Sequence, residues 1–146
     1  MTDEDDLLRL ENQLCFAMVT AARNVLSVYR PILEPLGLTH PQYLVMLALW
    51  ERSPRSLNDL ARELALEPAS ASPLVKRLEA DGLLVRQRSA GDERRLDIAL
   101  THAGRALRTR ALDVPRRVME RTGLDLESVA ALRNALADFA GRTRPS

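Results

Sequence analysis

Cys15 is the only cysteine in the sequence, and its thiol is the side chain with the most distinctive chemistry. A thiol reacts as its thiolate, so a reactive cysteine needs a neighbour that stabilises negative charge or donates a hydrogen bond. The adjacent Leu14 and Phe16 are apolar and do neither. Sequence neighbours alone therefore describe an inert core cysteine, because free cysteines are among the most buried residues.

Tyr29 is a candidate donor to that thiol. It follows Cys15 by 14 residues, which in one continuous helix is about 40° short of four turns and about 21 Å along the axis. The two side chains then share a helix face but cannot touch within one chain. In an antiparallel crossing of two copies, Tyr29 of one subunit could approach Cys15 of the other.

The composition predicts a cytoplasmic globular protein. An apolar share of 46% suffices for a core, and one cysteine cannot form an internal disulfide, as fits a reducing compartment. No apolar run approaches the roughly 18 to 20 residues that span a membrane, and the start MTDEDDLL is acidic, unlike a signal peptide. We find no metal-ligand cluster, glycine-rich phosphate loop or nucleophile elbow. We therefore expect no cofactor, no metal and no membrane partner.

Apolar periodicity predicts a mainly α-helical chain. We expect one long helix from Leu7 to Leu33, followed by a turn at Gly37. A second helix should begin at Thr39 and run to about Trp50, capped by the Thr39 hydroxyl with Gln42 three residues on. Ser56 and Asp59 repeat this capping pattern before a short third helix. A fourth helix should contain Pro73, either kinked there or with Pro73 in its first turns, and end at Gly82.

Two strands and two more helices complete the prediction. We predict strands at Leu83–Arg88 and at Leu96–Leu100, of which the second alternates between apolar and polar residues. The polar segment SAGDER joins them, and we expect it to be longer than a tight hairpin turn. Thr101 should cap a helix that continues to about Arg121. Asp125 should cap a last helix with an apolar stripe that includes Leu132 and Leu136.

The middle of the chain has the element order of a winged helix-turn-helix. In such a unit the second helix of the pair enters the DNA major groove, where hydroxyls and basic side chains contact base edges and phosphates. The exposed side of the fourth helix carries Ser70, Ser72, Lys76 and Arg77. The alternative is that these four residues form an ordinary solvated face.

The ribbon favours the DNA-binding interpretation. Net charge is only +1 and Lys76 is the only lysine among 21 basic residues, but arginines concentrate between Arg86 and Arg95. An arginine at a hairpin tip suits the narrow minor groove, so we expect Arg88 and Arg94 to bind DNA. Asp92 could brace the Arg94 guanidinium.

Long apolar stripes at both ends of the chain predict a homodimer, because a small monomer can hardly bury them. We expect residues 39–101 to form the DNA-binding lobe, and residues 7–36 and 102–141 to form the dimerisation helices of a single domain. Two lobes would bind a roughly palindromic site on double-stranded DNA.

The ribbon segment DGLLVRQRSAGDERRLDIALTHAG resembles the wing of the MarR family of transcriptional regulators. It has the Asp-x-Arg pattern at Asp92 and Arg94, and the Leu-Thr pair that opens the next helix at Leu100 and Thr101. The segments LENQLCFAM and LGLTHPQYLVMLALWE resemble the organic hydroperoxide resistance regulators, the OhrR subfamily, and its one-cysteine members. The resemblance covers nearly the whole chain.

The resemblance implies a role for three residues. In the OhrR subfamily the cysteine that matches Cys15 reacts with peroxide and is hydrogen-bonded by tyrosines of the partner subunit, one of which matches Tyr29. The second tyrosine of that pattern is replaced here by His40. We expect sensing to survive with altered pH dependence, since a histidine can donate to a thiolate; otherwise His40 is only a solvated residue beside a helix cap. Tyr43 is expected to be a packing residue.

These features predict a repressor that releases its operator when an organic hydroperoxide oxidises Cys15. Because the chain has no second cysteine, the oxidised thiol should end as a mixed disulfide with a low-molecular-weight thiol, a sulfenamide or an over-oxidised acid. One alternative is a MarR-type repressor released by a small aromatic or phenolic ligand, with Cys15 incidental. The other is a thiol peroxidase, which the missing resolving cysteine disfavours.

Overall fold

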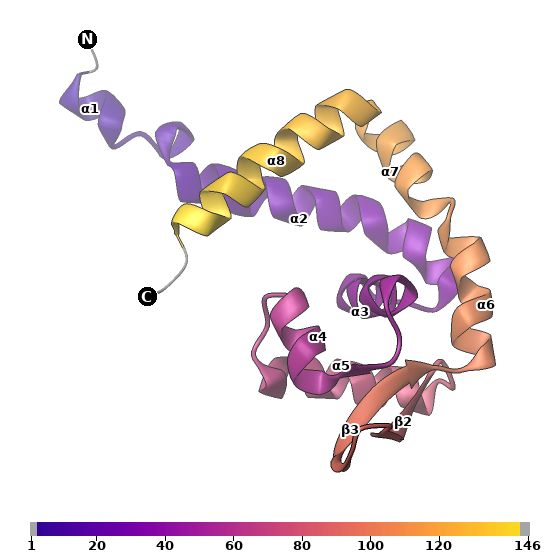
Figure 1. The fold of residues 1–146 in the computed structure, drawn as a ribbon. Coiled ribbons are helices and arrows are strands. Elements are labelled where there is room, and N and C mark those ends of the chain that lie inside the picture. The colour runs from indigo at the N-terminus through magenta and orange to yellow at the C-terminus, as the bar shows by residue number, and fades with distance from the viewer. Residues whose placement is uncertain (1–2, 144–146) are drawn as a thin grey trace. The chain divides into compact units, whose positions relative to one another are not determined.

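The computed structural model describes residues 3–143, which are mainly helical with one small antiparallel sheet (Figure 1). This confirms the expected class. The elements in chain order are α1 (Glu4–Leu7), η1 (Leu10–Asn12), α2 (Leu14–Leu33), η2 (Glu34–Leu36), α3 (His40–Glu51), β1 (Arg55–Ser56), α4 (Leu57–Glu63), α5 (Pro68–Ala80), β2 (Leu84–Ser89), β3 (Asp92–Leu100), α6 (His102–Ala111), α7 (Val114–Thr122) and α8 (Leu126–Arg142).

The chain forms two compact units, which are described separately. They divide between Val28 and Tyr29 and again between Val114 and Pro115. The unit from 29 to 114 contains α3 to α6 and the sheet, in strand order β1-β3-β2. Its core is formed by fully buried aliphatic side chains, among them Leu33, Met46, Leu49, Leu60, Leu78 and Ile98.

The predicted helix caps are confirmed. Thr39 Oγ1 accepts a hydrogen bond from the Gln42 backbone N–H, and Gln42 Oε1 accepts one from the Thr39 N–H at 3.0 Å, which completes a capping box. At the starts of α4, α6 and α8, the side-chain oxygens of Ser56, Thr101 and Asp125 accept a hydrogen bond from the backbone N–H three residues on, without the reciprocal bond of a capping box. Each cap satisfies a backbone donor that the helix itself leaves free.

The prediction of one continuous helix from Leu7 to Leu33 is wrong. The chain breaks into α1, η1 and α2, because the side-chain amides of Asn12 and Gln13 donate to the carbonyls of Asp6, Leu7 and Arg9 in place of helical N–H groups. The helix expected from Thr101 to Arg121 also divides, into α6 and α7. Pro115 contributes to this break because it has no N–H to donate to the carbonyl four residues earlier.

The ribbon turns more tightly than expected. Ser89 pairs with Asp92, so only Ala90 and Gly91 lie between the strands, and β3 begins at Asp92 instead of Leu96. The pairing shifts by a bulge between Arg88 and Ser89. The short strand β1 was missed, since its two residues carry no detectable alternation; it pairs with β3 at Ile98 and Asp97.

Gly104 allows α6 to lie against the start of the ribbon. A Cβ at this position would stand 2.2 Å from the carbonyl oxygen of Leu83, so no other residue fits without a backbone shift. The Trp50 indole Nε1 donates to the Gly104 carbonyl at 2.9 Å. Helices α3 and α6 are thereby joined by a hydrogen bond as well as by packing.

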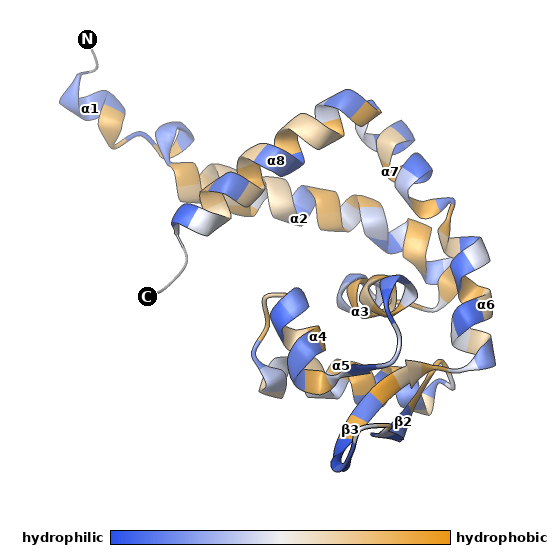
Figure 2. Ribbon diagram, in the orientation of Figure 1, coloured by the Kyte–Doolittle hydropathy of each residue, from blue (hydrophilic) through white to orange (hydrophobic). Residues whose placement is uncertain are grey.

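The other unit contains α1, η1, most of α2, and helices α7 and α8 from Pro115 onward. None of its described residues is buried. Hydrophobic residues recur along α2 and α8 (Figure 2), and many apolar side chains of this unit are therefore exposed. The most exposed are Leu7, Leu8, Leu10, Leu14, Leu126 and Leu132, each more than half exposed. Within residues 3–143, no helix is both long and apolar enough to cross a membrane.

Candidate functional site

Helix α5 presents one side to the core and the other to solvent. Ala71, Val75 and Leu78 are buried. Of the predicted DNA-binding residues, Ser70, Lys76 and Arg77 are exposed on the opposite side, and Ser72 is half-buried at its edge. Arg77 forms only a loose ion pair with Asp81 at 3.7 Å, and both side chains are well exposed. This pairing leaves the guanidinium available to a stronger anionic partner.

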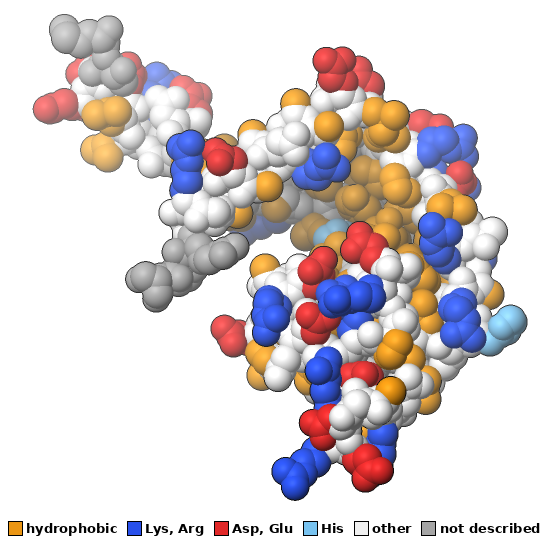
Figure 3. Space-filling model, in the orientation of Figure 1, with side chains coloured by type: hydrophobic (Ala, Val, Ile, Leu, Met, Phe, Trp, Pro, Cys, Tyr) orange, Lys and Arg blue, Asp and Glu red, His pale blue; other side chains and the backbone are white. Residues whose placement is uncertain are grey.

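The ribbon tip carries the remaining predicted residues, and Figure 3 shows basic and acidic side chains gathered over it. Arg88, Asp92 and Arg94 are all exposed. The Asp92 carboxylate accepts a hydrogen bond from the backbone N–H of Arg94 at 3.0 Å, which replaces the guanidinium contact that the sequence suggested. Asp92 therefore shapes the tip. Within the described residues the Arg94 guanidinium has no partner, while Arg88 donates to the Glu93 carbonyl.

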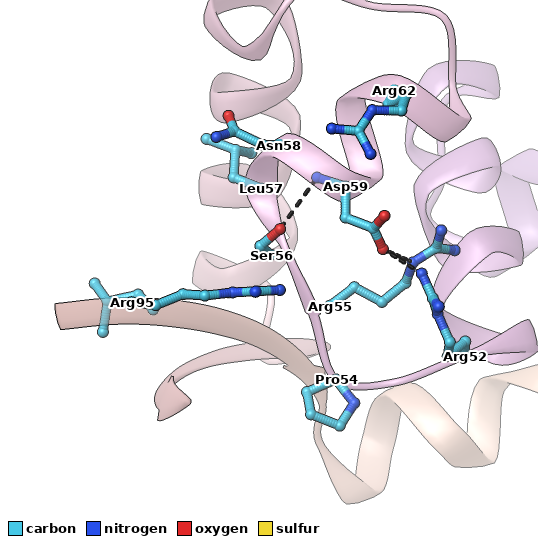
Figure 4. Close-up of a pocket in the computed structure, with 10 residues that line it drawn as sticks. Arg52, Pro54, Arg55, Ser56, Leu57, Asn58, Asp59, Arg62 and Arg95 are labelled. Atoms are coloured by element: carbon cyan, nitrogen blue, oxygen red, sulfur yellow. Dashed lines mark hydrogen bonds and ion pairs between the residues drawn. The ribbon is translucent and has the colours of Figure 1, made fainter. Parts of the chain in front are cut away.

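A basic pocket of about 710 Å³ lies at the root of the ribbon, between β1, α4 and β3 (Figure 4). It was missed by sequence reasoning. Arg95 extends from β3 toward Ser56, and Arg62 projects from α4 on the other side. The complete lining is Arg52, Pro54, Arg55, Ser56, Leu57, Asn58, Asp59, Arg62, Arg95 and Leu96. The run of charged residues in ERSPRSLNDLARE was the available signal.

Arg55 is the structural centre of this pocket. Its side chain is only 4% exposed, and its guanidinium donates to Asp59 at 2.9 Å and to the Ala48 carbonyl at 3.0 Å. Glu63 lies 3.5 Å from the same group. The hydrogen bond from Arg55 is the main cause of the lowered pKa of Asp59, which Arg52 also contacts. One buried arginine thus ties the end of α3 and strand β1 to α4.

Cys15 is exposed, which contradicts the interpretation as a core residue. It is the second residue of α2, and the first turn of this helix contains no acidic side chain. The neighbouring Leu14 and Phe16 are also exposed, at 61% and 45%. The thiol therefore lies within an apolar surface in the first turn of α2.

Tyr29, His40 and Tyr43 lie close together in the unit of residues 29–114. The rings of Tyr29 and His40 meet edge-on with centroids 4.9 Å apart, and the Tyr43 ring lies 6.1 Å from Tyr29. Burial lowers the pKa of His40 and raises the pKa of Tyr29. The pKa of Tyr43 is raised by burial and then by Tyr29. Near neutral pH, His40 is therefore uncharged and both phenols keep their protons.

Comparison with known proteins identifies the family. The MarR family model matches residues 38–96, the segment from just before α3 into β3. The organic hydroperoxide resistance transcriptional regulator of Bacillus subtilis (strain 168) is 36% identical over 136 residues, which cover 93% of this chain and 92% of that relative. The chain belongs to the MarR family. The resemblance drawn from the Cys15 and His40 segments is confirmed by this relative.

Solved MarR-type structures extend the likeness. Reduced AbfR bound to DNA, a protein of Staphylococcus epidermidis, matches with a TM-score of 0.76 and 31% identity, over 96% of this chain and 98% of that one. CouR from Rhodococcus jostii RHA1, bound to p-coumaroyl-CoA, matches with a TM-score of 0.75 and 28% identity, over 95% and 99%. The protein is thus a DNA-binding transcriptional regulator with a winged-helix fold, and its relatives are regulators, not enzymes.

Proposed function

We propose that this MarR-family protein is a homodimeric repressor that senses organic hydroperoxides through Cys15 and then releases its operator. The observation that carries the proposal is the exposed thiol in the first turn of α2. The identity with a hydroperoxide resistance regulator over nearly the whole chain supports it. The protein would act on DNA in the cytoplasm.

The dimer is proposed from the terminal helices. The unit formed by residues 3–28 and 115–143, which holds α1, η1, most of α2, α7 from Pro115 onward and α8, has no buried residue in the part of the chain that the structure describes. Exposed apolar side chains on this scale mark an interface with another protein. A second copy of the same chain is the occupant that explains apolar stripes on several helices at once, and the terminal helices would then form the dimerisation region.

The DNA-binding lobe is proposed to be about residues 39–101. Its α5 would enter the major groove with Ser70, Ser72, Lys76 and Arg77, and Arg94 at the ribbon tip would enter the minor groove. Arg88 would contact a phosphate, and Asp92 would hold the tip in shape. Two lobes related by the dimer axis would bind a roughly palindromic operator.

The sensor is proposed to be completed across the dimer. Tyr29 and His40 of one subunit would approach Cys15 of the other, where the phenol O–H and one imidazole N–H are hydrogen-bond donors to a thiolate. His40 would act as a neutral donor, because burial lowers its pKa. This assignment gives His40 the role of the tyrosine that the OhrR pattern has at this position.

The proposed chemistry needs only the thiol, the peroxide and a second thiol. The thiolate attacks the distal oxygen of the hydroperoxide, the O–O bond breaks, and the alcohol leaves, so that the sulfur is oxidised to a sulfenic acid. A low-molecular-weight thiol then attacks this sulfur, a disulfide forms and water leaves. The thiol attached to Cys15 adds bulk at the apolar dimer interface. This bulk would shift the two DNA-binding lobes relative to each other, so that their spacing would no longer match the two half-sites of the operator.

The test is a DNA-binding titration on the promoter nearest the protein's own gene, with reduced protein and with protein treated with cumene hydroperoxide. The wild type should lose most of its affinity for DNA after this treatment. When Cys15 carries a mixed disulfide with a small thiol, excess dithiothreitol should reduce that disulfide and restore the affinity. Cys15→Ser should bind DNA in both conditions, and mass spectrometry should place the modification on Cys15. Release of the Cys15→Ser protein by the hydroperoxide would overturn the sensor proposal.

A second candidate function is release by a small aromatic ligand. The basic pocket at the root of the ribbon favours it, since four arginines line a space of about 710 Å³, and CouR is a relative bound to an aromatic thioester. In this case an aromatic carboxylate such as p-coumarate should release DNA from the wild type and from Cys15→Ser equally. The same two proteins therefore separate the two candidates.

A further inference from the structure

Pro73 lies at the centre of the exposed face of α5. At about 100° per residue, Ala69 and Arg77 lie about 40° to either side of it, and Ser70 and Lys76 about 60°. The buried residues of the helix are about 140° to 160° away. Pro73 itself is exposed. A proline in a helix interior is normally disfavoured, and here it occupies the central position of the exposed face.

The ring gives this face two unusual properties. It places a rigid apolar surface between polar neighbours, because proline has no polar side-chain atom and its φ is fixed. It also lacks the N–H that would bond to the carbonyl of Ala69 four residues earlier, so that carbonyl loses its usual helical donor. Ala69 is exposed as well. The residues nearest Pro73 toward the start of the helix, Ala69 and Ser70, are small and permit close approach.

The DNA major groove contains a matching group. Thymine is the one base that presents a methyl group there, and it is distinguished by apolar contact. Hydroxyls and arginines contact polar base edges and cannot replace such a contact. When the exposed face of α5 lies in the groove, the proline ring at its centre faces the base edges on the floor of the groove. The group that it contacts there must tolerate an apolar surface.

We propose that Pro73 is a specificity-determining residue that selects a thymine in each operator half-site by contact with the C5 methyl group. The inference rests on the proposed function, in which α5 enters the major groove. Removal of the methyl should weaken wild-type binding about fourfold, the effect of one buried methyl group. The selectivity belongs to the ring and not to the positive charges of the helix.

The experiment compares thymine with deoxyuridine, which pairs identically but lacks the methyl. An operator is first selected from a random duplex library with the reduced full-length protein. Each thymine is then replaced singly, and the dissociation constant is measured at fixed salt. The wild type should lose about fourfold in affinity at one thymine per half-site, whereas Pro73→Ala, which lacks the ring atoms Cγ and Cδ, should lose most of this difference between the thymine and deoxyuridine forms.

One control variant and one check of folding make the result decisive. Pro68→Ala changes an exposed proline at the first position of the same helix, about 140° from Pro73 around the axis, and should keep the wild-type ratio. Pro73→Ala should fold, because alanine restores a helical hydrogen bond, and circular dichroism checks this. A wild type indifferent to every thymine methyl, or a Pro73→Ala protein with the wild-type ratio, would overturn the inference.

Failure of the wider proposal has a different signature. Arg77→Ala should weaken binding on every duplex sequence and reduce its salt dependence, since a phosphate contact carries no sequence information. If Arg77→Ala and Lys76→Ala both bind like the wild type, α5 is not the DNA-binding helix and the proposed interface is wrong. If both lose affinity while Pro73→Ala keeps its discrimination, only the reading of thymine by Pro73 is wrong.

Discussion

The imidazole of His40 meets the ring of Tyr29 edge-on, with centroids 4.9 Å apart and ring planes inclined by 67°. Burial lowers the pKa of this histidine and raises the pKa of the tyrosine. Both side chains are therefore uncharged near neutral pH. Acid must charge His40 against a half-buried aromatic environment, whereas in the unfolded chain the same imidazole takes up its proton freely.

We predict that His40 makes the protein less stable as pH falls below about 6.5, the value of an unperturbed histidine. Between that pH and the lower folded pKa, the unfolded chain binds more protons than the folded chain, so the free energy of unfolding decreases. Urea unfolding at about pH 7.5 and about pH 5.5 measures the decrease. His40→Gln should reduce it, and His102→Gln, at an exposed position, should not. An unchanged decrease in His40→Gln would contradict the assignment.

The ribbon tip should contribute to affinity through charge. Arg94→Ala is expected to weaken DNA binding and to reduce the slope of log affinity against log salt concentration by about one, because one cation is removed from the negative potential of the minor groove. Titrations at several salt concentrations measure both effects. Arg9→Ala removes an exposed arginine far from the ribbon in sequence and should leave the slope unchanged. An Arg94→Ala slope equal to that of the wild type would exclude a role for the tip.

The apolar stripe of α8 should hold the dimer together. Leu136 is 45% exposed in the single chain, and Leu136→Glu would place a charge in the proposed interface. We expect analytical ultracentrifugation to show a dimer for the wild type and a shift toward monomer for this variant. Leu66→Glu, at a similarly exposed leucine before α5 (39%), should remain dimeric. A dimeric Leu136→Glu protein would place the interface elsewhere.

Gly104 should be irreplaceable for a steric reason. In Gly104→Ala the new Cβ would lie 2.2 Å from the Leu83 carbonyl oxygen, and we expect the strain to lower the free energy of unfolding by about 1–3 kcal/mol. Trp50 fluorescence reports the transition at this contact, because its indole donates to the Gly104 carbonyl. Gly141→Ala meets no atom within 4 Å in α8 and should be neutral or stabilising.

The ion pair between Arg55 and Asp59, two residues that line the basic pocket, should contribute more to stability than surface ion pairs do. Asp59→Asn removes the negative charge nearest to Arg55, whose side chain is 4% exposed while that of Asp59 is 28% exposed. We expect this change to destabilise the fold by about 1–3 kcal/mol. The matched control is Asp138→Asn, whose partner Arg142 is 76% exposed, with an expected change below about 1 kcal/mol. Equal unfolding midpoints for the two variants would show that Arg55 does not depend on Asp59.

Local signals predicted the helix starts well. Thr39, Ser56, Thr101 and Asp125 all cap helices as expected, because a cap depends on residues within one turn of each other. Helix continuity was harder to predict. The break before α2 depends on which carbonyls the amides of Asn12 and Gln13 reach, and apolar periodicity does not encode this.

The sequence predicted individual residues of the candidate site, but it did not predict which of them lie next to one another in space. Sequence spacing named the α5 residues, and the structure exposes Ser70, Lys76 and Arg77 on one side. The pocket around Arg55 escaped prediction because β1 has only two residues, and its pairing with β3 brings Arg95 to α4 from far along the chain. The proximity of His40 to Tyr29 likewise depends on how the end of α2 packs, which no spacing rule supplies.

The unit of residues 3–28 and 115–143 buries no described residue within one chain, and this has a consequence for the protein in the cell. Under the proposed dimer, their folding is tied to association, so by mass action the melting temperature should rise with protein concentration. A regulator of this kind senses its own abundance. At low copy number the dimer would dissociate, and the less stable monomer would be degraded by proteases. The operator would then be unoccupied even without an oxidant.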